Sequence, residues 1–108
     1  SVKILAVGDV CGEPGLEFLE KRLKDFKAGI GFNVVNGENT NVVGITPKQA
    51  DALFRAGADV VTLGNHTWTR TELRPYLEQR RRILRPANFG PQCPGKGINV
   101  YSTPFGDV

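Results

Sequence analysis

The stretch DVVTLGNH, residues 59–66, places an apolar, β-branched run directly before a glycine and two polar residues. A run of this kind predicts a short buried strand that ends in a loop. The same arrangement occurs twice upstream, where the run over 2–7 ends at GD (residues 8–9) and the run over 32–35 ends at NGEN (residues 36–39). We therefore expect three strands, each followed by a loop that carries polar side chains.

Amphipathic helices are expected after these strands. Beyond a Gly/Pro-rich turn over 12–15, leucines recur at helical spacing through residues 16–26. TPKQ, residues 46–49, has a capping hydroxyl, a proline at the first helical position and a glutamine three residues after the cap, which predicts a capping box. Gly57 is placed to end that helix. TRTE, residues 69–72, repeats the capping pattern and predicts a third helix.

Two further strands are expected at 82–85 and 98–101, joined by an irregular connection rich in proline and glycine. Repeated alternation of strand and helix predicts parallel strands joined by right-handed crossovers. The fold class is therefore α/β, a layered parallel sheet with flanking helices. Because all strands of such a sheet end at one edge and ligands bind outside that edge, the polar side chains of the loops are expected to meet there.

The composition narrows the function classes. A chain of 108 residues with 40% hydrophobic residues fits one compact domain. A net charge of +3 is too small to indicate nucleic acid without a localised basic patch. No apolar run approaches the roughly 20 residues of a membrane span, so the sequence predicts a cytoplasmic protein without a membrane partner. Cys11 and Cys93 lie far apart and form no CxxC pair, which predicts reduced thiols.

The three loops also share a chemistry. Any one of them fits an ordinary turn, because Asp and Asn side chains bond to their own backbone after a strand. Their recurrence at three successive strand ends instead favours an oxygen-rich cluster with one imidazole. Carboxylate, amide and imidazole groups suit a divalent metal, and the side chain of Glu38 is long enough to bridge two ions.

Five motifs, in order along the chain, carry a resemblance to a known family. They are GDV at 8–10, NGEN at 36–39, GIT at 44–46, TLGNHTW at 62–68 and LRPAN at 84–88. Together they resemble the YmdB-like branch of the calcineurin-like metallophosphoesterases, over nearly the whole chain. The resemblance implies a four-layer α/β/β/α fold. Residues 1–108 would form a single α/β domain, the N-terminal half of a longer phosphoesterase domain.

Carried over by position, the resemblance assigns a role to each polar residue of the loops. Asp9 and Asn39 would bind a first metal ion and Asn65 a second. Glu38 would bridge the two ions, and His66 would be the catalytic general acid beside the leaving oxygen. The resemblance also implies a metal-dependent phosphodiesterase that hydrolyses cyclic nucleotides, such as cyclic AMP, or related phosphodiesters. Its two ions would be divalent or mixed-valence iron or manganese.

The sequence departs from this family in one respect. Family members are longer, and their second half supplies three further histidine ligands. This chain contains one histidine, His66, which takes the role of the acid. The ligands Asp9, Glu38, Asn39 and Asn65 would therefore form a half-site. We interpret the chain as an N-terminal fragment of a metallophosphodiesterase, with little activity expected of this piece alone.

Other interpretations stay open. The loops, with a basic cluster of Arg80-Arg81-Arg82 plus Arg85, also fit a non-catalytic nucleotide- or RNA-binding module, and as mere turns they fit an α/β interaction domain. The arginines alternatively complement the dipole at a helix end. Cys11 is interpreted as a packing or bystander residue rather than a thiolate ligand, and Trp68 as core packing rather than a base-stacking platform. A homo-oligomer is compatible with each interpretation.

Overall fold

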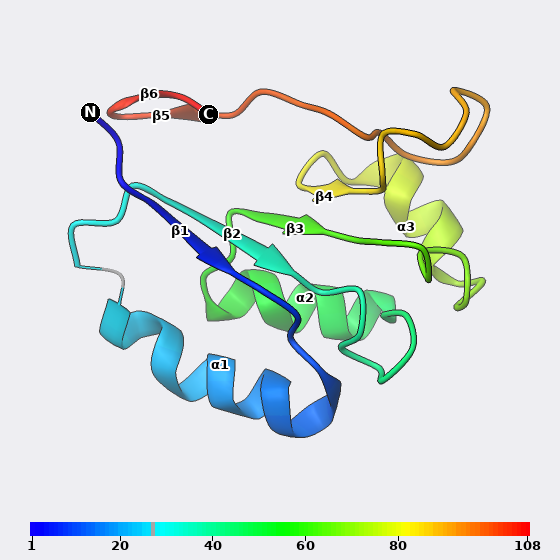
Figure 1. Ribbon diagram of the computed structural model, residues 1–108, viewed down its shortest axis with the longest axis horizontal. Coiled ribbons are helices and arrows are strands. Elements are labelled where there is room, and N and C mark those ends of the chain that lie inside the picture. Colours follow the sequence, from blue (N-terminus) through cyan, green and yellow to red (C-terminus); the bar gives the residue numbers. More distant parts are fainter. Residues whose placement is uncertain (27) are drawn as a thin grey trace.

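The computed structural model describes residues 1–26 and 28–108. Its elements, in chain order, are β1 (Ile4–Val7), α1 (Gly12–Phe26), β2 (Phe32–Asn36), α2 (Pro47–Ala56), β3 (Val60–Thr62), α3 (Leu73–Gln79), β4 (Ile83–Leu84), β5 (Ser102–Thr103) and β6 (Gly106–Asp107). The first four strands form one sheet in the order β1-β2-β3-β4, and β5 pairs with β6 in a separate antiparallel hairpin (Figure 1).

All strands of the larger sheet run parallel. β1 pairs with β2 in the register Ile4↔Phe32, and β2 pairs with β3 in the register Val34↔Val60. A helix joins each strand to the next, as crossover connections between parallel strands require. Figure 1 shows α1 and α2 side by side along the sheet. The predicted α/β class, with a parallel sheet and flanking helices, is confirmed.

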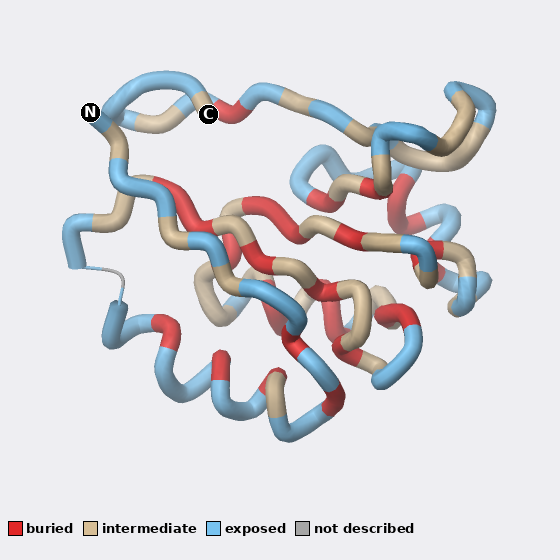
Figure 2. Tube along the Cα trace, in the orientation of Figure 1, coloured by how far each residue is buried: buried red, intermediate tan, exposed pale blue. Residues whose placement is uncertain are grey.

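The main core lies between this sheet and the helices α1, α2 and α3. Val35 and Val61 of the central strands are fully buried and pack against leucines of the helices. Figure 2 shows buried residues along both the strands and the helices. On the opposite face, Phe32 and Val60 pack against Tyr101 of the C-terminal segment, and the rings of Phe32 and Tyr101 lie 5.6 Å apart. Apolar contacts on both faces hold the central strands, and thereby the loops at their carboxyl ends.

The start and end of α2 are as predicted. The Thr46 hydroxyl accepts the Gln49 N–H at 3.2 Å and the Gln49 side chain accepts the Thr46 N–H at 3.0 Å, which is the capping box. Gly57, at φ 127°, ends the helix with its N–H bonded to two helix carbonyls. α1, in contrast, begins within the predicted turn, because Pro14 fits the first helical turn, where its missing N–H needs no partner.

The predicted capping box at 69–72 is wrong. α3 begins at Leu73, and its N-cap Glu72 has helical φ and ψ with no side-chain cap. The reason is that this segment forms backbone turns instead of a helix N-terminus. The Thr69 N–H donates to the His66 carbonyl at 3.2 Å, and the Leu73 N–H donates to the Arg70 carbonyl at 3.1 Å. A helix was correctly predicted there, but its first turn lies further along the chain.

The C-terminal strands also differ from the prediction. The strand expected at 82–85 is present as β4, but 98–101 is not a strand. The Asn99 side chain accepts the next backbone N–H, that of Val100, at 2.8 Å, which removes a donor from strand pairing. Pairing begins at Tyr101, whose backbone exchanges two hydrogen bonds with Val108, so the hairpin lies downstream of the predicted strand.

Two observations bear on the compositional predictions. Cys11 and Cys93 are free thiols, as predicted. In the part of the chain that the structure describes, no helix is both long and apolar enough to cross a membrane. The cellular compartment stays a prediction.

Candidate functional site

The loops that follow β1, β2 and β3 are bonded to one another through their backbones. The Val10 N–H donates to the Asn36 carbonyl at 3.1 Å, and the Gly12 N–H donates to the Asn39 carbonyl at 3.0 Å. The loop after β2 is joined in turn to β3, because the Gly37 N–H donates to the carbonyl of the last β3 residue at 3.0 Å. The three loops therefore form one connected edge of the sheet, called here the loop edge.

Asp9 and Asn39 form the first pair on the loop edge. The Asn39 amide nitrogen Nδ2 donates to Asp9 Oδ1 at 2.9 Å. The backbone of Asp9 is in the left-handed region, at φ 43°, a conformation that aspartate tolerates better than most residues. This conformation turns the chain sharply out of β1. Within the described residues, the second carboxylate oxygen of Asp9 and the amide oxygen of Asn39 have no hydrogen-bond partner.

Glu38 and His66 form the second pair. Glu38 Oε2 accepts the backbone N–H of His66 at 2.8 Å and lies 3.3 Å from the ring nitrogen Nδ1. Nδ1 is buried. Its separation from Glu38 Oε2 is within ion-pair distance, but the two groups are not aligned for a hydrogen bond. The side chain of Glu38 is 14% exposed and that of His66 is 42% exposed. The carboxylate therefore lies against one side of an imidazole whose other side stays open to solvent.

Gly64 makes room for this pair. A Cβ atom at position 64 would lie 2.3 Å from the carboxyl carbon of Glu38 and 2.3 Å from its Oε1. Such an approach is far inside a normal contact distance, so any other residue would displace the carboxylate. The sequence pattern identified this glycine only as the end of a strand. The sequence feature that could have indicated that Gly64 leaves space for the site is its position immediately before Asn65 and His66.

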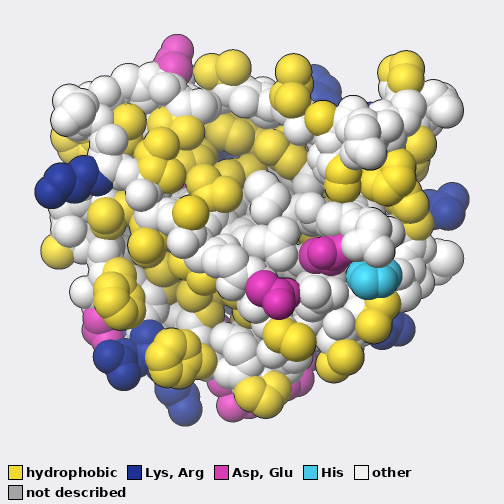
Figure 3. Space-filling model, viewed as in Figure 1, with side chains coloured by type: hydrophobic (Ala, Val, Ile, Leu, Met, Phe, Trp, Pro, Cys, Tyr) yellow, Lys and Arg dark blue, Asp and Glu magenta, His cyan; other side chains and the backbone are white. Residues whose placement is uncertain are grey.

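Asn65 completes the set, with Nδ2 lying 3.5 Å from His66 Nε2. The structure thus brings the predicted residues together on the loop edge as two groups, Asp9 with Asn39, and Glu38 with His66 and Asn65. Figure 3 shows the histidine in cyan beside acidic side chains in magenta on one face of the molecule. Their roles as ligands and acid stay predictions.

Two buried threonines, missed in the sequence, stabilise the loops: Thr40 connects two of them and Thr67 closes a turn within the third. The Thr40 hydroxyl lies 2.9 Å from the Gly37 carbonyl and 3.3 Å from the Val10 carbonyl, so it connects the first two loops. The Thr67 hydroxyl donates to the Gly64 carbonyl at 2.5 Å. A threonine directly follows both NGEN and GNH in the sequence, which was the available signal.

The donor atoms of the loop edge suit a hard divalent ion without completing its shell. Asp9 and Glu38 offer carboxylate oxygens, and Asn39 and Asn65 offer amide oxygens, which are ligand types suited to manganese and iron. Within residues 1–26 and 28–108, no group of three or more His, Cys, Asp or Glu side chains is placed to hold an ion. The residues present therefore fit part of a metal shell.

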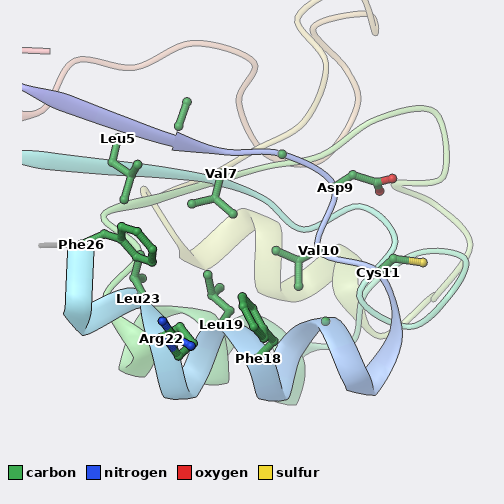
Figure 4. A pocket seen from close by; sticks show the side chains of 13 residues that line it. Leu5, Val7, Asp9, Val10, Cys11, Phe18, Leu19, Arg22, Leu23 and Phe26 are labelled. Carbon is green, nitrogen blue, oxygen red and sulfur yellow. The ribbon is translucent and has the colours of Figure 1, made fainter.

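An apolar hollow of about 380 Å³ runs between β1 and α1 (Figure 4). Asp9 and Cys11 lie at one end of it, and Phe18 and Phe26 of α1 are largely exposed along it. β1 pairs with β2 alone among the described strands, so the hollow follows the open edge of the sheet. Cys11 is exposed and therefore does not pack in the core.

Trp68 and Arg85 both have structural positions. Trp68 packs against the main core, as predicted, with its ring centroid 5.3 Å from that of Phe89 in an edge-on arrangement. Arg85 is buried, and its guanidinium donates to the carbonyls of Pro94 at 3.0 Å and Pro86 at 3.1 Å. It holds the Pro/Gly-rich connection in place, so it is not part of the predicted basic surface.

The other arginines of the predicted basic cluster, residues 80–82, lie between α3 and β4, at the opposite end of the sheet from the loop edge. Arg80 lies over the ring of Tyr76, at 4.9 Å from the ring centroid. Burial, together with a hydrogen bond to Asp51, raises the pKa of Tyr76 to about 12. The hollow beside these arginines is also lined by the carboxylates of Asp51 and Asp59, so its charge is mixed. A role in phosphate or RNA binding stays a prediction.

A parallel sheet that gathers carboxylate, amide and imidazole groups at the carboxyl ends of its strands defines an α/β protein, a class in which ligands usually bind at that edge. The chain belongs to the YmdB-like protein family, whose family model matches residues 5–107. The 2',3'-cyclic-nucleotide 2'-phosphodiesterase of Bacillus subtilis (strain 168) is 38% identical to it over 100 residues, which are 90% of this chain and 38% of that protein.

Two solved structures are also similar to the chain. A protein from Thermus thermophilus, described as hypothetical, is 34% identical with a TM-score of 0.87, covering 96% of this chain and 41% of that one. A phosphatase from Mycoplasma pneumoniae is 28% identical with a TM-score of 0.85, covering 94% of this chain and 39% of that one. The chain thus spans about two fifths of the length of the relatives it matches.

Proposed function

We propose that this chain supplies part of the active site of a metal-dependent phosphodiesterase that hydrolyses a cyclic nucleotide or a related phosphodiester. The observation that carries the proposal is the contact of Glu38 with His66, in which a largely buried carboxylate holds a solvent-accessible imidazole at the carboxyl edge of a parallel sheet. Family membership and a relative named as a phosphodiesterase support the same class of reaction.

The reaction needs one proton at a defined place. Hydrolysis adds the oxygen of water to phosphorus, breaks one P–O bond and delivers a proton to the alkoxide that leaves. We assign this delivery to His66, because its ring is exposed on the side away from Glu38, where Asn65 lies beside Nε2. Glu38 accepts the backbone N–H of His66 and lies beside Nδ1 of the ring. General acid catalysis of this kind typically contributes about 10²- to 10⁴-fold.

The metal ions would be held by Asp9, Glu38, Asn39 and Asn65. Bound iron or manganese ions would neutralise charge on the phosphoryl oxygens and lower the pKa of the attacking water. The shell needs further ligands, which in this proposal come from protein beyond this chain, since the relatives are about two and a half times as long. The chain alone is therefore expected to bind these ions weakly and to turn over little substrate.

The substrate class is proposed from the B. subtilis relative, whose name specifies a 2',3'-cyclic nucleotide. When the cyclic phosphodiester is opened, the P–O bond to one ribose oxygen breaks. That oxygen departs as an alkoxide, a poor leaving group that requires an acid such as His66. We place the reaction in the cytoplasm, where free thiols such as Cys11 and Cys93 persist.

Substitutions at His66 and Glu38 in the intact protein distinguish the role of general acid from the role of metal ligand. His66→Ala should leave manganese binding nearly unchanged but slow hydrolysis of a 2',3'-cyclic nucleotide by about 10²- to 10⁴-fold. Glu38→Gln should lose metal binding and activity together, because a neutral amide cannot hold two cations as a shared carboxylate does. Calorimetric titration measures the binding, and product release measures the rate.

Bis-p-nitrophenyl phosphate serves as the control substrate. Its nitrophenolate leaving group needs little protonation, so its hydrolysis should depend much less on His66. If His66→Ala loses metal as completely as Glu38→Gln does, the imidazole is a ligand or a structural group. If it hydrolyses both substrates at the wild-type rate, the assignment of the acid is wrong.

A further inference from the structure

Val42, three residues after Asn39, has a backbone conformation that valine rarely adopts. Its φ is 63°, and the N–H of Val43 donates to the Asn41 carbonyl, across Val42, at 2.6 Å. A three-residue turn closed in this way around a residue with positive φ is the rare, strained form of the γ-turn. For a β-branched side chain, the left-handed region is particularly unfavourable.

Burial does not compensate for this strain. The side chain of Val42 is 67% exposed, and the adjacent Val43 is 39% exposed. Among the described residues, Asp9 and Val42 are the two non-glycine residues with positive φ, and both lie on loops of the loop edge. Residues in such conformations persist only where the surrounding structure imposes them, and they cluster at active sites and ligand clamps.

The turn is fixed to the loop that carries His66. The Asn41 N–H donates to the Gly44 carbonyl at 2.9 Å, which closes the loop around Val42. With its amide oriented to satisfy its hydrogen bonds, the Asn41 side-chain oxygen accepts from Arg70 Nε at 3.1 Å. A Cβ atom at Gly44 would lie 3.4 Å from the His66 carbonyl oxygen, so the two loops are in contact. Asn41 and Gly44, on either side of the turn, thereby hold it against the imidazole loop, while the Val42 side chain lies beside the first loop, where a Cβ atom at Gly12 would be 3.9 Å from Val42 Cγ2.

We propose that Val42 is a specificity-determining residue that contacts the nucleobase of a nucleotide substrate; this inference rests on the proposed function. The polar groups of the loop edge suit the phosphate and its metal ions, whereas Val42 presents an apolar group on the loop that follows Asn39. A nucleobase has a flat, weakly polar face. Moving that face out of water and into contact with an apolar side chain is favourable. The constrained turn pre-organises the valine, which lowers the entropic cost of binding.

Val42→Gly in the intact protein tests this contact. Glycine adopts a positive φ without strain, so the turn is kept while the isopropyl group is removed. The KM for a 2',3'-cyclic nucleotide should rise about 5- to 10-fold with kcat within about twofold, as loss of uniform substrate binding requires. The KM for methyl p-nitrophenyl phosphate, a phosphodiester without a base, should not change. Val42→Asn, which also tolerates positive φ, should give the same result.

The matched control is Val100→Gly, which removes a comparably exposed valine from the C-terminal segment and should change neither KM. An unchanged KM for the cyclic nucleotide in Val42→Gly, or an equal rise for both diesters, overturns the inference and leaves the proposed function intact. Failure of the wild-type protein to hydrolyse either diester overturns the proposed function, and this inference with it.

Discussion

Glu38 keeps its position because the residue that faces it has no side chain. Its carboxylate fills the space in which a Cβ atom of residue 64 would lie, and from there it reaches both the backbone and the ring of His66. The geometry of the candidate acid therefore depends on the absence of a side chain at Gly64. A single methyl group at this position would disturb the site as much as the loss of a reacting group.

Gly64→Ala should strongly reduce the activity of the intact protein while leaving it folded. The added Cβ displaces the Glu38 side chain, which can move, and a displacement of about 1 Å at a catalytic group costs about 10²-fold in rate. Gly8→Ala is the matched control, since a Cβ at Gly8 meets nothing within 4 Å. Steady-state kinetics and thermal unfolding of both variants are the measurements. Wild-type activity in Gly64→Ala would show that the position of Glu38 is unimportant.

At this scale, the sequence predicted which residues reach the loop edge but not how they pair. Asp9, Glu38 and His66 were identified because each follows an apolar run, which needs only local information. The contact of Glu38 with the His66 N–H joins residues 28 positions apart, and it depends on the register of neighbouring strands. The interlocking hydroxyl of Thr40 was missed for the same reason.

At the scale of elements, one four-residue pattern has two outcomes in this chain. At 46–49 it forms the capping box of α2, but at 69–72 it does not cap α3. The difference lies in the preceding segment. The Thr67 and Thr69 N–H groups bond back to the carbonyls of Gly64 and His66, so the backbone turns serve the loop edge before the helix begins. A local pattern predicts a helix, whereas its first turn depends on the loop in front of it.

Thr46→Ala should destabilise the chain by about 1 kcal/mol, the usual value of an N-cap side chain. For a domain of this size, the midpoint of thermal unfolding should fall by roughly 4–8 °C. Thr71→Ala is the control, because Thr71 is exposed and its side chain makes no hydrogen bond in the described residues; it should change stability by less than about 0.5 kcal/mol. Circular dichroism on heating checks both. Equal midpoints for the two variants would mean that the capping box contributes nothing.

At the scale of the whole molecule, the two ends of the sheet differ in chemistry. The carboxyl end carries the loop edge with its acidic, amide and imidazole groups, and the opposite end carries the arginines of 80–82 with Asp51 and Asp59. A net charge of +3 could not reveal this separation. It follows from the parallel direction of β1–β4, which the alternation of strands and helices did predict.

The ligands proposed from this chain form an incomplete metal shell, and in the proposed enzyme the rest of a larger domain would complete it. Four oxygen ligands are proposed from this chain, which spans about two fifths of its relatives. The four-layer fold and the remaining ligands stay predictions, because they concern protein beyond these residues. What the chain itself must show is that metal ions prefer the loop edge to every other part of its surface.

A titration of the chain with Mn²⁺, followed by amide NMR signals, tests this claim most directly. Paramagnetic Mn²⁺ broadens the signals of nearby residues even when it binds weakly. Signals from residues 8–10, 37–40 and 64–67 should broaden first, because they surround the carboxylate and amide oxygens of the loop edge. Earlier broadening at Asp51 and Asp59, or uniform broadening along the chain, would contradict the assignment of this edge as a metal-binding half-site.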